Sequence, residues 1–400
     1  MNTRTRTDER PATSLLAPIV LLLIVSLALR PGIVSIGPIL LSIRQHFRLT
    51  YSEAALLTSI PDVCMGLFVL CVPALSRRLG IERTIALSLL LLGLAIFFRA
   101  LATSAPVLLF WTALVGIGIA VAGALIGGWI KEHFADQASL FMGIYAGGLS
   151  IGATIAAVGT GYIAALFKNW RYGAGMWCVI AVTALASWSY LARHMRRQTA
   201  HPADQKARAE IALPWHEGRA WLLAVFFGLS QFVAYACLAW LAPWNNEEHM
   251  SDIPGGLMLS VFTLFLAAGS FAAGGFAGKS GDRRLWLLLG TIISAVGFLG
   301  LAFLPSTWPT LFVVAIAFGQ GVCFAMGMML PLDNAAKASD GHAWTMFVLC
   351  IGYMIAALGP LSFGFLRDWR GEFSDSWLLL LAISLAMLAM IPSLKRKTIK

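Results

Sequence analysis

SLLAPIVLLLIVSLALRPGIVSIGPILL, residues 14–41, is the first of a series of long apolar runs in this chain. A helix needs about 20 apolar residues to cross a bilayer, and this longer run carries one charged residue, Arg30, near its middle. A cation at that depth costs roughly 2.5–3.5 kcal/mol on insertion scales, so it must face a water-filled cavity or a partner. The run therefore predicts a membrane-spanning helix whose cation meets an anion, either a substrate or a carboxylate of the protein.

The whole chain has the composition of a membrane protein. Of its 400 residues, 59% are hydrophobic and 12% charged, with a mean hydropathy of +0.79, whereas an average soluble domain carries about 25% charged residues. Short polar breaks separate the apolar runs and leave no room for a folded soluble domain. We predict an all-α membrane protein with twelve transmembrane helices in two six-helix pseudo-repeats. The expected helices cover residues 15–42, 54–75, 84–103, 107–130, 138–166, 171–192, 220–243, 256–278, 285–304, 309–332, 342–366 and 376–394.

The distribution of Lys and Arg predicts the orientation. With the amino terminus inside, 21 of the 29 basic residues fall in cytoplasmic segments, as the positive-inside rule requires. We expect a multi-pass protein of the cytoplasmic (inner) membrane with both termini in the cytoplasm. The formal net charge of +10 reflects this topology, and its scatter over many loops argues against nucleic-acid binding. The polar stretch 1–11 lacks a small-residue cleavage site, so we expect no removable signal peptide.

The longest polar segment, residues 193–218, is basic and contains two prolines. It separates six apolar runs from six. The sequence therefore predicts an N-terminal six-helix half (1–192), a cytoplasmic linker (193–218) and a C-terminal six-helix half (219–400).

Internal similarity supports this division. The loop after the second expected helix reads PALSRRLGIER (73–83), and the loop after the eighth reads GGFAGKSGDRR (274–284). The two loops are about half the chain apart, as an internal duplication requires. The matched positions, which we expect to serve the conformational change, are Arg78 and Gly80 in the first loop and Lys279 and Gly281 in the second.

Both loops resemble the signature Gly-x-x-x-Asp-Arg-x-Gly-Arg-Arg of the major facilitator superfamily. The run Arg30-Pro31-x-x-x-Ser35-x-Gly37-Pro38-x-Leu40 is similar to the first helix of that superfamily's cyanate and 2-nitroimidazole transporter branch. The resemblance spans essentially the whole chain and implies two parallel six-helix halves around a central cavity. It also implies movement of a small anion or small polar organic molecule, with or without proton coupling. Further matching stretches are 54–61 (AALLTSIP), Arg99, 130–134 (IKEHF), 239–243 (AWLAP), 352–353 and 359–360.

Arg30 is the leading candidate for substrate binding. Its guanidinium offers five donors in a fixed fork, which suits a small planar anion or a carboxylate. Proline and glycine at 31–32 and 37–38 loosen the helix beyond it, because proline lacks a backbone donor. Broken helices at membrane depth are tolerated where they line a cavity. The alternative is a structural arginine paired with Asp62 or with carbonyl groups.

Neutral polar side chains at a similar depth are candidate hydrogen-bond partners of the substrate. Gln231 and Tyr235 lie four residues apart and therefore share a helix face. The resemblance implies that the first, fourth, seventh and tenth helices line the cavity, which adds Gln320. Bonds between helices are the alternative for each of these residues. The predicted substrate-binding residues are Arg30, Ser35, Arg99, Gln231, Tyr235, Gln320 and Tyr353, with Tyr145 and Ser150 as weaker candidates.

Two further charged residues lie within apolar runs, and the sequence leaves more than one role open for each. Asp62 follows Pro61 in the second expected helix, and we expect either a proton-coupling carboxylate or a salt-bridge partner of an intramembrane arginine. Arg99 lies close to the outer end of the third expected helix, where it can snorkel. It either binds substrate, serves the structure, or pairs as an external gate with Asp62 or the acidic loop 247–252.

Two other residue types receive structural roles. Trp129, Trp240 and Trp244 lie near helix ends and are expected to be anchors at the membrane–water interface. All six cysteines fall inside apolar runs, so we predict neither disulfides nor a metal site.

These patterns favour a secondary active transporter for a small monovalent anion, cyanate-like or a small carboxylate, working by alternating access with or without coupling to protons. The alternative is efflux of small aromatic drugs such as nitroimidazoles. An enzyme is disfavoured, because the apolar runs contain no Ser/His/Asp set, metal-spaced His pair or carboxylate pair. We expect no cofactor, no nucleic-acid partner, a small-molecule substrate, contact with the lipid bilayer, and a monomer.

Overall fold

The computed structural model describes residues 13–198, 212–248, 250–277, 283–335 and 340–395. Every regular element within these residues is helical. The first half comprises α1 (Thr13–Leu29), α2 (Pro31–Val34), η1 (Gly37–Ile39), α3 (Leu40–Phe47), α4 (Tyr51–Leu79), α5 (Ile81–Ala100), α6 (Ala105–His133), η2 (Ala135–Gln137), α7 (Ala138–Leu166), α8 (Trp170–Gly175) and α9 (Trp177–Gln198). The second comprises α10 (Gly218–Glu248), α11 (Gly255–Ala277), α12 (Arg284–Phe303), α13 (Pro309–Asn334), α14 (Gly341–Ala356), α15 (Leu358–Arg370), α16 (Ser374–Met390) and η3 (Ile391–Leu394).

Twelve helical segments of the described residues are long and apolar enough to cross a membrane. Each coincides with an expected helix, with ends that differ by a few residues, so the predicted fold class is confirmed. The first segment (16–47) runs through α1, α2, η1 and α3, and the eleventh (341–370) combines α14 and α15. The protein is a multi-pass membrane protein.

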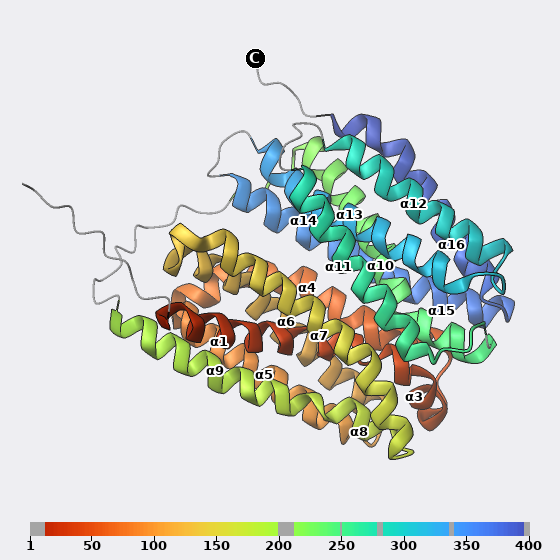
Figure 1. Cartoon of the computed structure of the whole chain (residues 1–400), viewed down its shortest axis with the longest axis horizontal. Coiled ribbons are helices and arrows are strands. Elements are labelled where there is room, and N and C mark those ends of the chain that lie inside the picture. The colour runs from red at the N-terminus through yellow and green to blue at the C-terminus, as the bar shows by residue number, and fades with distance from the viewer. Residues whose placement is uncertain (1–12, 199–211, 249, 278–282, 336–339, 396–400) are drawn as a thin grey trace, which may run out of the picture.

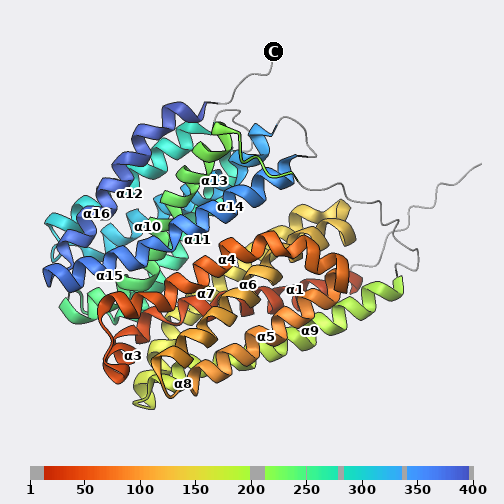
Figure 2. The ribbon, with the colours of Figure 1, turned by 180° about the vertical axis from the view of Figure 1, so that it is seen from behind.

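The helices form two groups, α1–α9 and α10–α16 (Figures 1 and 2). The described chain starts and stops at one end of the bundle, near Thr13 and Lys395, and we call this the terminal end. The opposite end, which carries the short connections after α3, α5, α7, α10, α12 and α15, is the distal end. Much of the predicted linker 193–218, namely 199–211, lies outside the described residues, as do Lys279 and Gly281.

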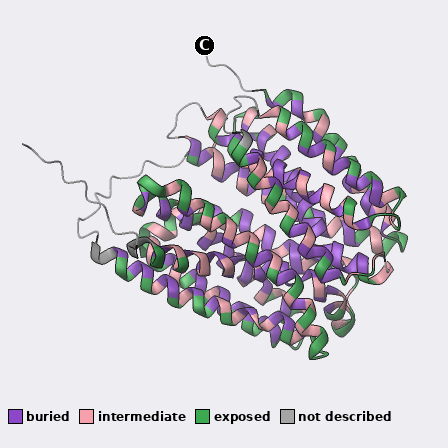
Figure 3. Cartoon of the chain, viewed as in Figure 1, coloured by how far each residue is buried: buried purple, intermediate pink, exposed green. Residues whose placement is uncertain are grey.

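The hydrophobic core joins the two groups from the middle of the bundle to the distal end. One core fills the first group and extends into the second through the distal part of α10, from Phe232 to Trp244. A separate core, which includes Ala220 and Phe227 of α10, fills the terminal end of the second group. Figure 3 shows the buried residues on helix faces that point into the bundle. Among the described residues, the two groups therefore share this apolar core from the middle of the bundle to the distal end.

Tryptophans near the helix ends belong to this core. Trp129, Trp240 and Trp244 are 0–1% exposed, and Trp240 donates a hydrogen bond to the Pro360 carbonyl at 2.8 Å. The prediction that they anchor the protein at the membrane surface is wrong. Their rings pack between helices, where the burial of a large apolar ring stabilises the fold and the indole N–H can donate a hydrogen bond.

Backbones of the two groups come into close contact at the distal end. A Cβ atom on Gly37 of η1 would lie 2.7 Å from the Leu238 carbonyl oxygen of α10, and one on Gly364 of α15 would lie 2.7 Å from that of Tyr51. Because atoms do not approach so closely without a hydrogen bond, only glycine allows these pairs of backbones to meet. Each contact joins one group to the other.

The first transmembrane segment is broken where the sequence predicts. α1 ends at Leu29, Arg30 precedes α2, and η1 begins at Gly37. Pro31 and Pro38 have no N–H to continue the helical ladder. The Ile36 N–H bonds to the Ile33 carbonyl at 3.2 Å, one residue short of its α-helical acceptor. The break therefore frees carbonyl groups in the middle of the bundle and leaves Arg30 at a helix junction.

Candidate substrate-binding site

Arg30 lies among polar side chains of both groups. Its guanidinium lies close to the Tyr235 side chain and in the electrostatic neighbourhood of Tyr353, Tyr145 and Asp62. We call these five residues the Arg30 cluster. The Tyr235 and Tyr353 rings meet edge to face, with centroids 6.1 Å apart. Arg30, Tyr145 and Tyr353 are half-buried, as expected for side chains that line an internal space.

The cluster draws on five transmembrane segments. Arg30 follows α1, Asp62 belongs to α4 and Tyr145 to α7, all in the first group. Tyr235 belongs to α10 and Tyr353 to α14 in the second group. The predicted residues Arg30, Asp62, Tyr235 and Tyr353 thus come together, and Tyr145, a weaker candidate on sequence grounds, joins them. Ser150, the other weaker candidate, lies on the same helix as Tyr145 and donates a hydrogen bond to the Ala146 carbonyl of that helix at 3.0 Å.

Asp62 is the acidic member of the cluster. It is 0% exposed, and neither carboxylate oxygen has a hydrogen-bond partner among the described residues. A buried polar group without a hydrogen bond is costly. Asp62 forms no ion pair with Arg30 or Arg99 in this conformation, and its two expected roles, proton coupling and pairing with an arginine, stay predictions.

Other predicted site residues bond within one group. Gln320 is 1% exposed, accepts a hydrogen bond from Ser230 at 3.2 Å and donates one to Ser294 at 3.3 Å. It therefore links α10, α12 and α13, which fits the interhelical alternative. Gln231 is also buried, at 4% exposed, next to Ser230 in the chain.

Arg99 and Ser35 lie together inside the first group. Arg99 is 0% exposed and donates to the Gly32 carbonyl at 2.8 Å and to the Ser35 hydroxyl at 3.4 Å. This geometry fits the structural alternative for Arg99. The acidic loop offered as its gate partner bonds elsewhere, because Glu247 forms an ion pair with Arg367 at 3.3 Å.

A set of hydrogen bonds between the two groups lies at the distal end, and the sequence did not predict it. We call this set, formed by Tyr51, Ser52, Glu247 and Asp368, the polar latch. Asp368 of α15 accepts hydrogen bonds from the Tyr51 and Ser52 amides, both at 2.8 Å, and from the Ser52 hydroxyl at 2.6 Å. The Tyr51 hydroxyl donates to Glu247 of α10 at 2.8 Å. The latch partners lie up to 317 residues apart. The Thr50 capping box indicates where α4 starts, but no sequence signal identifies an acid from the other half.

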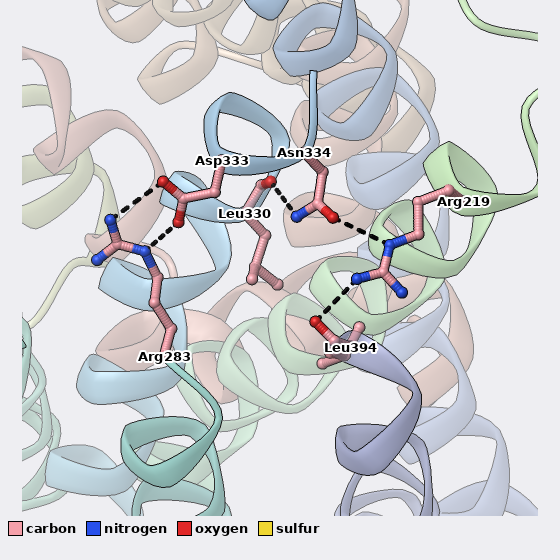
Figure 4. A network of polar contacts seen from close by, with 6 residues as sticks. All are labelled: Arg219, Arg283, Leu330, Asp333, Asn334 and Leu394. Atoms are coloured by element: carbon pink, nitrogen blue, oxygen red, sulfur yellow. Dashed lines mark hydrogen bonds and ion pairs between the residues drawn. The ribbon is translucent and has the colours of Figure 1, made fainter. Parts of the chain in front are cut away.

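A second network braces the terminal end of the second group (Figure 4). Arg283, in the second basic loop, pairs with Asp333 at the end of α13, and Arg219 donates to Asn334 at 3.0 Å. Arg219 also donates to the Leu394 carbonyl at 2.8 Å. These bonds tie the start of α10 to the ends of α13 and η3.

In the first basic loop, Arg78 is exposed and Gly80 has a φ of +84°. This left-handed conformation favours glycine and allows the sharp turn between α4 and α5. Lys279 and Gly281, their predicted counterparts, lie outside the described residues.

A pocket of about 890 Å³ lies apart from the Arg30 cluster, at the distal end between α7 and α11. Its lining includes Lys168 and Arg171. Arg171 already donates to the carbonyls of Ala100 and Ala102, at 2.9 and 2.8 Å, so its donors are largely used. The Arg30 cluster is the better candidate site, because it combines a cation, phenols and a carboxylate from both groups. Among the described residues, no cluster of His, Cys, Asp or Glu could hold a metal ion.

Residues 22–360 match the Major Facilitator Superfamily. The chain belongs to this superfamily. It is 31% identical to the cyanate transport protein CynX of Escherichia coli K12, over 90% of this chain and 92% of that protein. It is 29% identical to the 2-nitroimidazole transporter of the same organism, over 92% of each. The fold matches the crystal structure of a D-xylose–proton symporter with a TM-score of 0.77 and 15% identity, covering 94% and 97% of the two chains. The chain is therefore a transport protein for a small molecule and not an enzyme.

Proposed function

We propose that this chain is a secondary active transporter for a small monovalent anion, cyanate-like or a small carboxylate. The observation that carries the proposal is the Arg30 cluster, in which a half-buried guanidinium faces phenols of both groups and one buried carboxylate. Guanidinium and phenol groups donate hydrogen bonds to an anion, and the few donors suit a small one. The 31% identical relative is a cyanate transport protein, which agrees with this substrate class.

The charge in the middle of the bundle supports a single negative charge on the substrate. Arg30 and Asp62 are the charged members of the Arg30 cluster, and Arg99 is enclosed apart from it in the first group. With Asp62 protonated, the cluster carries one net positive charge. A monovalent anion neutralises this charge, and neutrality is strongly favoured where little water screens electrostatic interactions.

The position of the cluster suits alternating access. Arg30, Asp62 and Tyr145 move with the first group, and Tyr235 and Tyr353 with the second. An anion held by both sets stabilises one arrangement of the two groups more than another, which is what a ligand must do to change a conformation. Because the site is complete within one chain, we expect a monomer. The Lys and Arg bias supports a cytoplasmic position for the terminal end.

Efflux of a small nitroaromatic compound is the second candidate. The edge-to-face Tyr235–Tyr353 pair, which Phe227 extends at 6.1 Å from Tyr353, offers aromatic surfaces on which such a ring can pack. The oxygens of a nitro group can accept hydrogen bonds from the Arg30 guanidinium in place of an anion.

A melting experiment distinguishes these functions. The purified protein is heated in detergent with cyanate, nitrite, formate or a neutral nitroimidazole. A ligand at 100 times its dissociation constant stabilises the native state by about 2.7 kcal/mol. We expect an anion-dependent rise in melting temperature that Arg30→Gln abolishes and that Arg370→Gln, which alters an exposed arginine, preserves. A rise with nitroimidazole alone, retained in Arg30→Gln, would overturn the anion proposal.

A further inference from the structure

Arg99 is a buried cation that forms no ion pair with an acid in the described part of the chain. It is 0% exposed in the middle of the first group, and its Nε has no hydrogen-bond partner. Among the described residues no carboxylate pairs with it, and its hydrogen bonds go to Gly32 and Ser35. A buried charge without a counterion is costly, so a role in packing alone is a weak explanation for an arginine at this position.

The acceptor that Arg99 uses is one that the broken helix sets free. In a continuous α-helix the Gly32 carbonyl would accept from the Ile36 N–H. Here that N–H bonds to the Ile33 carbonyl instead, at 3.2 Å, and Arg99 donates to the Gly32 carbonyl at 2.8 Å. A second arm of the same guanidinium reaches the Ser35 hydroxyl at 3.4 Å, at the end of α2. The planar fork of arginine serves both acceptors at once, which a lysine ammonium does less well.

The segment that Arg99 holds is the one that positions Arg30. Arg30 directly precedes α2, and its carbonyl accepts the Ile33 and Val34 amides, both at 3.1 Å. Moving α2 therefore moves the Arg30 backbone relative to Tyr235 and Tyr353 on the other group. Arg99 reaches α2 from α5 without touching the Arg30 cluster.

We propose that Arg99 is a positioning residue of the anion site: by holding the Gly32 carbonyl and the Ser35 hydroxyl, it fixes the α2 segment that presents Arg30 to the substrate. This inference rests on the proposed function for its transport readout. It also has a readout that needs no substrate, because a segment released from Arg99 exchanges its amide hydrogens faster.

The chain provides a matched control. Arg219 also donates to two acceptors of the backbone, the carbonyls of Leu394 and Lys395, but it does so at the terminal end of the second group, away from α2 and α5. Arg219→Met therefore removes two hydrogen bonds of an arginine to backbone carbonyls without releasing the Arg30 segment.

The test compares wild type, Arg99→Met, Arg99→Lys and Arg219→Met in proteoliposomes, with cyanate and formate as probes. We expect Arg99→Met to raise KM about tenfold or more while Vmax changes less, since misplacing a binding group by about 1 Å can cost up to about a hundredfold. Arg99→Lys should fall between Arg99→Met and wild type. Hydrogen exchange in peptides covering residues 31–39 should be faster in Arg99→Met and unchanged in Arg219→Met.

Three results would overturn the inference. The first is a folded Arg99→Met protein with wild-type KM. The second is an Arg219→Met protein whose KM rises as much, since this indicates a general loss of stability. The third is unchanged hydrogen exchange at 31–39 in Arg99→Met. If wild type responds to no small anion, the proposed function fails, and hydrogen exchange still decides whether Arg99 holds the segment. If Arg99→Met does not insert, Arg99→Lys carries both readouts.

Discussion

Removing the Asp368 carboxylate should release the distal end. Asp368 accepts three hydrogen bonds from the start of α4, at 2.8, 2.8 and 2.6 Å, and each one links the two groups. A hydrogen bond contributes roughly 0.5–1.5 kcal/mol net, and the exposure of this site places the sum near the lower end, at about 2 kcal/mol. The contacts exist only while the distal end is closed. Their loss should therefore shift the equilibrium toward the distal-open state by about 30-fold, because 1.4 kcal/mol is tenfold.

The fold should survive this change. Thr50 still caps α4 within its own half, since its hydroxyl accepts from the Glu53 amide at 3.1 Å and its amide donates to the Glu53 carboxylate at 2.8 Å. The lost free energy therefore acts on the contact between the groups and not on the formation of α4.

The population of the distal-open state is measured from distances between spin labels on the 167–169 and 304–308 loops. The labels are attached to a variant without native cysteines. We expect Asp368→Ala to add or enlarge a long-distance component. The control is Asp375→Ala, which breaks an ion pair with Arg370 at 3.2 Å at the same end but within the second half. Identical distance distributions for wild type and Asp368→Ala, or an equal shift in Asp375→Ala, would refute the assignment of the latch.

Three further changes test other parts of the structure. Asp62→Asn should remove any dependence of uptake on a proton gradient while anion-induced stabilisation persists; a gradient effect that survives in proteoliposomes excludes Asp62 as the coupling group. Gly364→Ala should favour the distal-open state in the same spin-label assay, because its Cβ would lie 2.7 Å from the Tyr51 carbonyl oxygen, whereas Gly147→Ala, with no atom within 4 Å of its Cβ, should not. Asp333→Asn breaks a partly exposed ion pair and should lower the free energy of unfolding by roughly 1 kcal/mol without changing KM. Melting and uptake are measured together, and a changed KM would contradict this prediction.

The sequence by itself determined the membrane class, the twelve spans and the break in the first span. These features are local: a span needs only length and hydropathy, and a break needs only prolines at 31 and 38. The sequence also identified Arg30 and Asp62, because a charge in an apolar run is costly wherever it lies. Four of the five members of the Arg30 cluster were predicted, Arg30 and Asp62 by their charge and Tyr235 and Tyr353 by their depth, and Tyr145 was a weaker candidate.

Only the tertiary structure decided which polar groups meet. Arg99 and Arg30 look alike in sequence, yet one bonds to a carbonyl of the broken helix and the other faces tyrosines of both groups. Gln320 carries the same amide as a ligand-binding glutamine, but its oxygen accepts a hydrogen bond from Ser230 and its nitrogen donates one to Ser294. The physical reason is that hydrogen bonding and burial depend on partners far away in the chain, which helical periodicity and hydropathy do not encode.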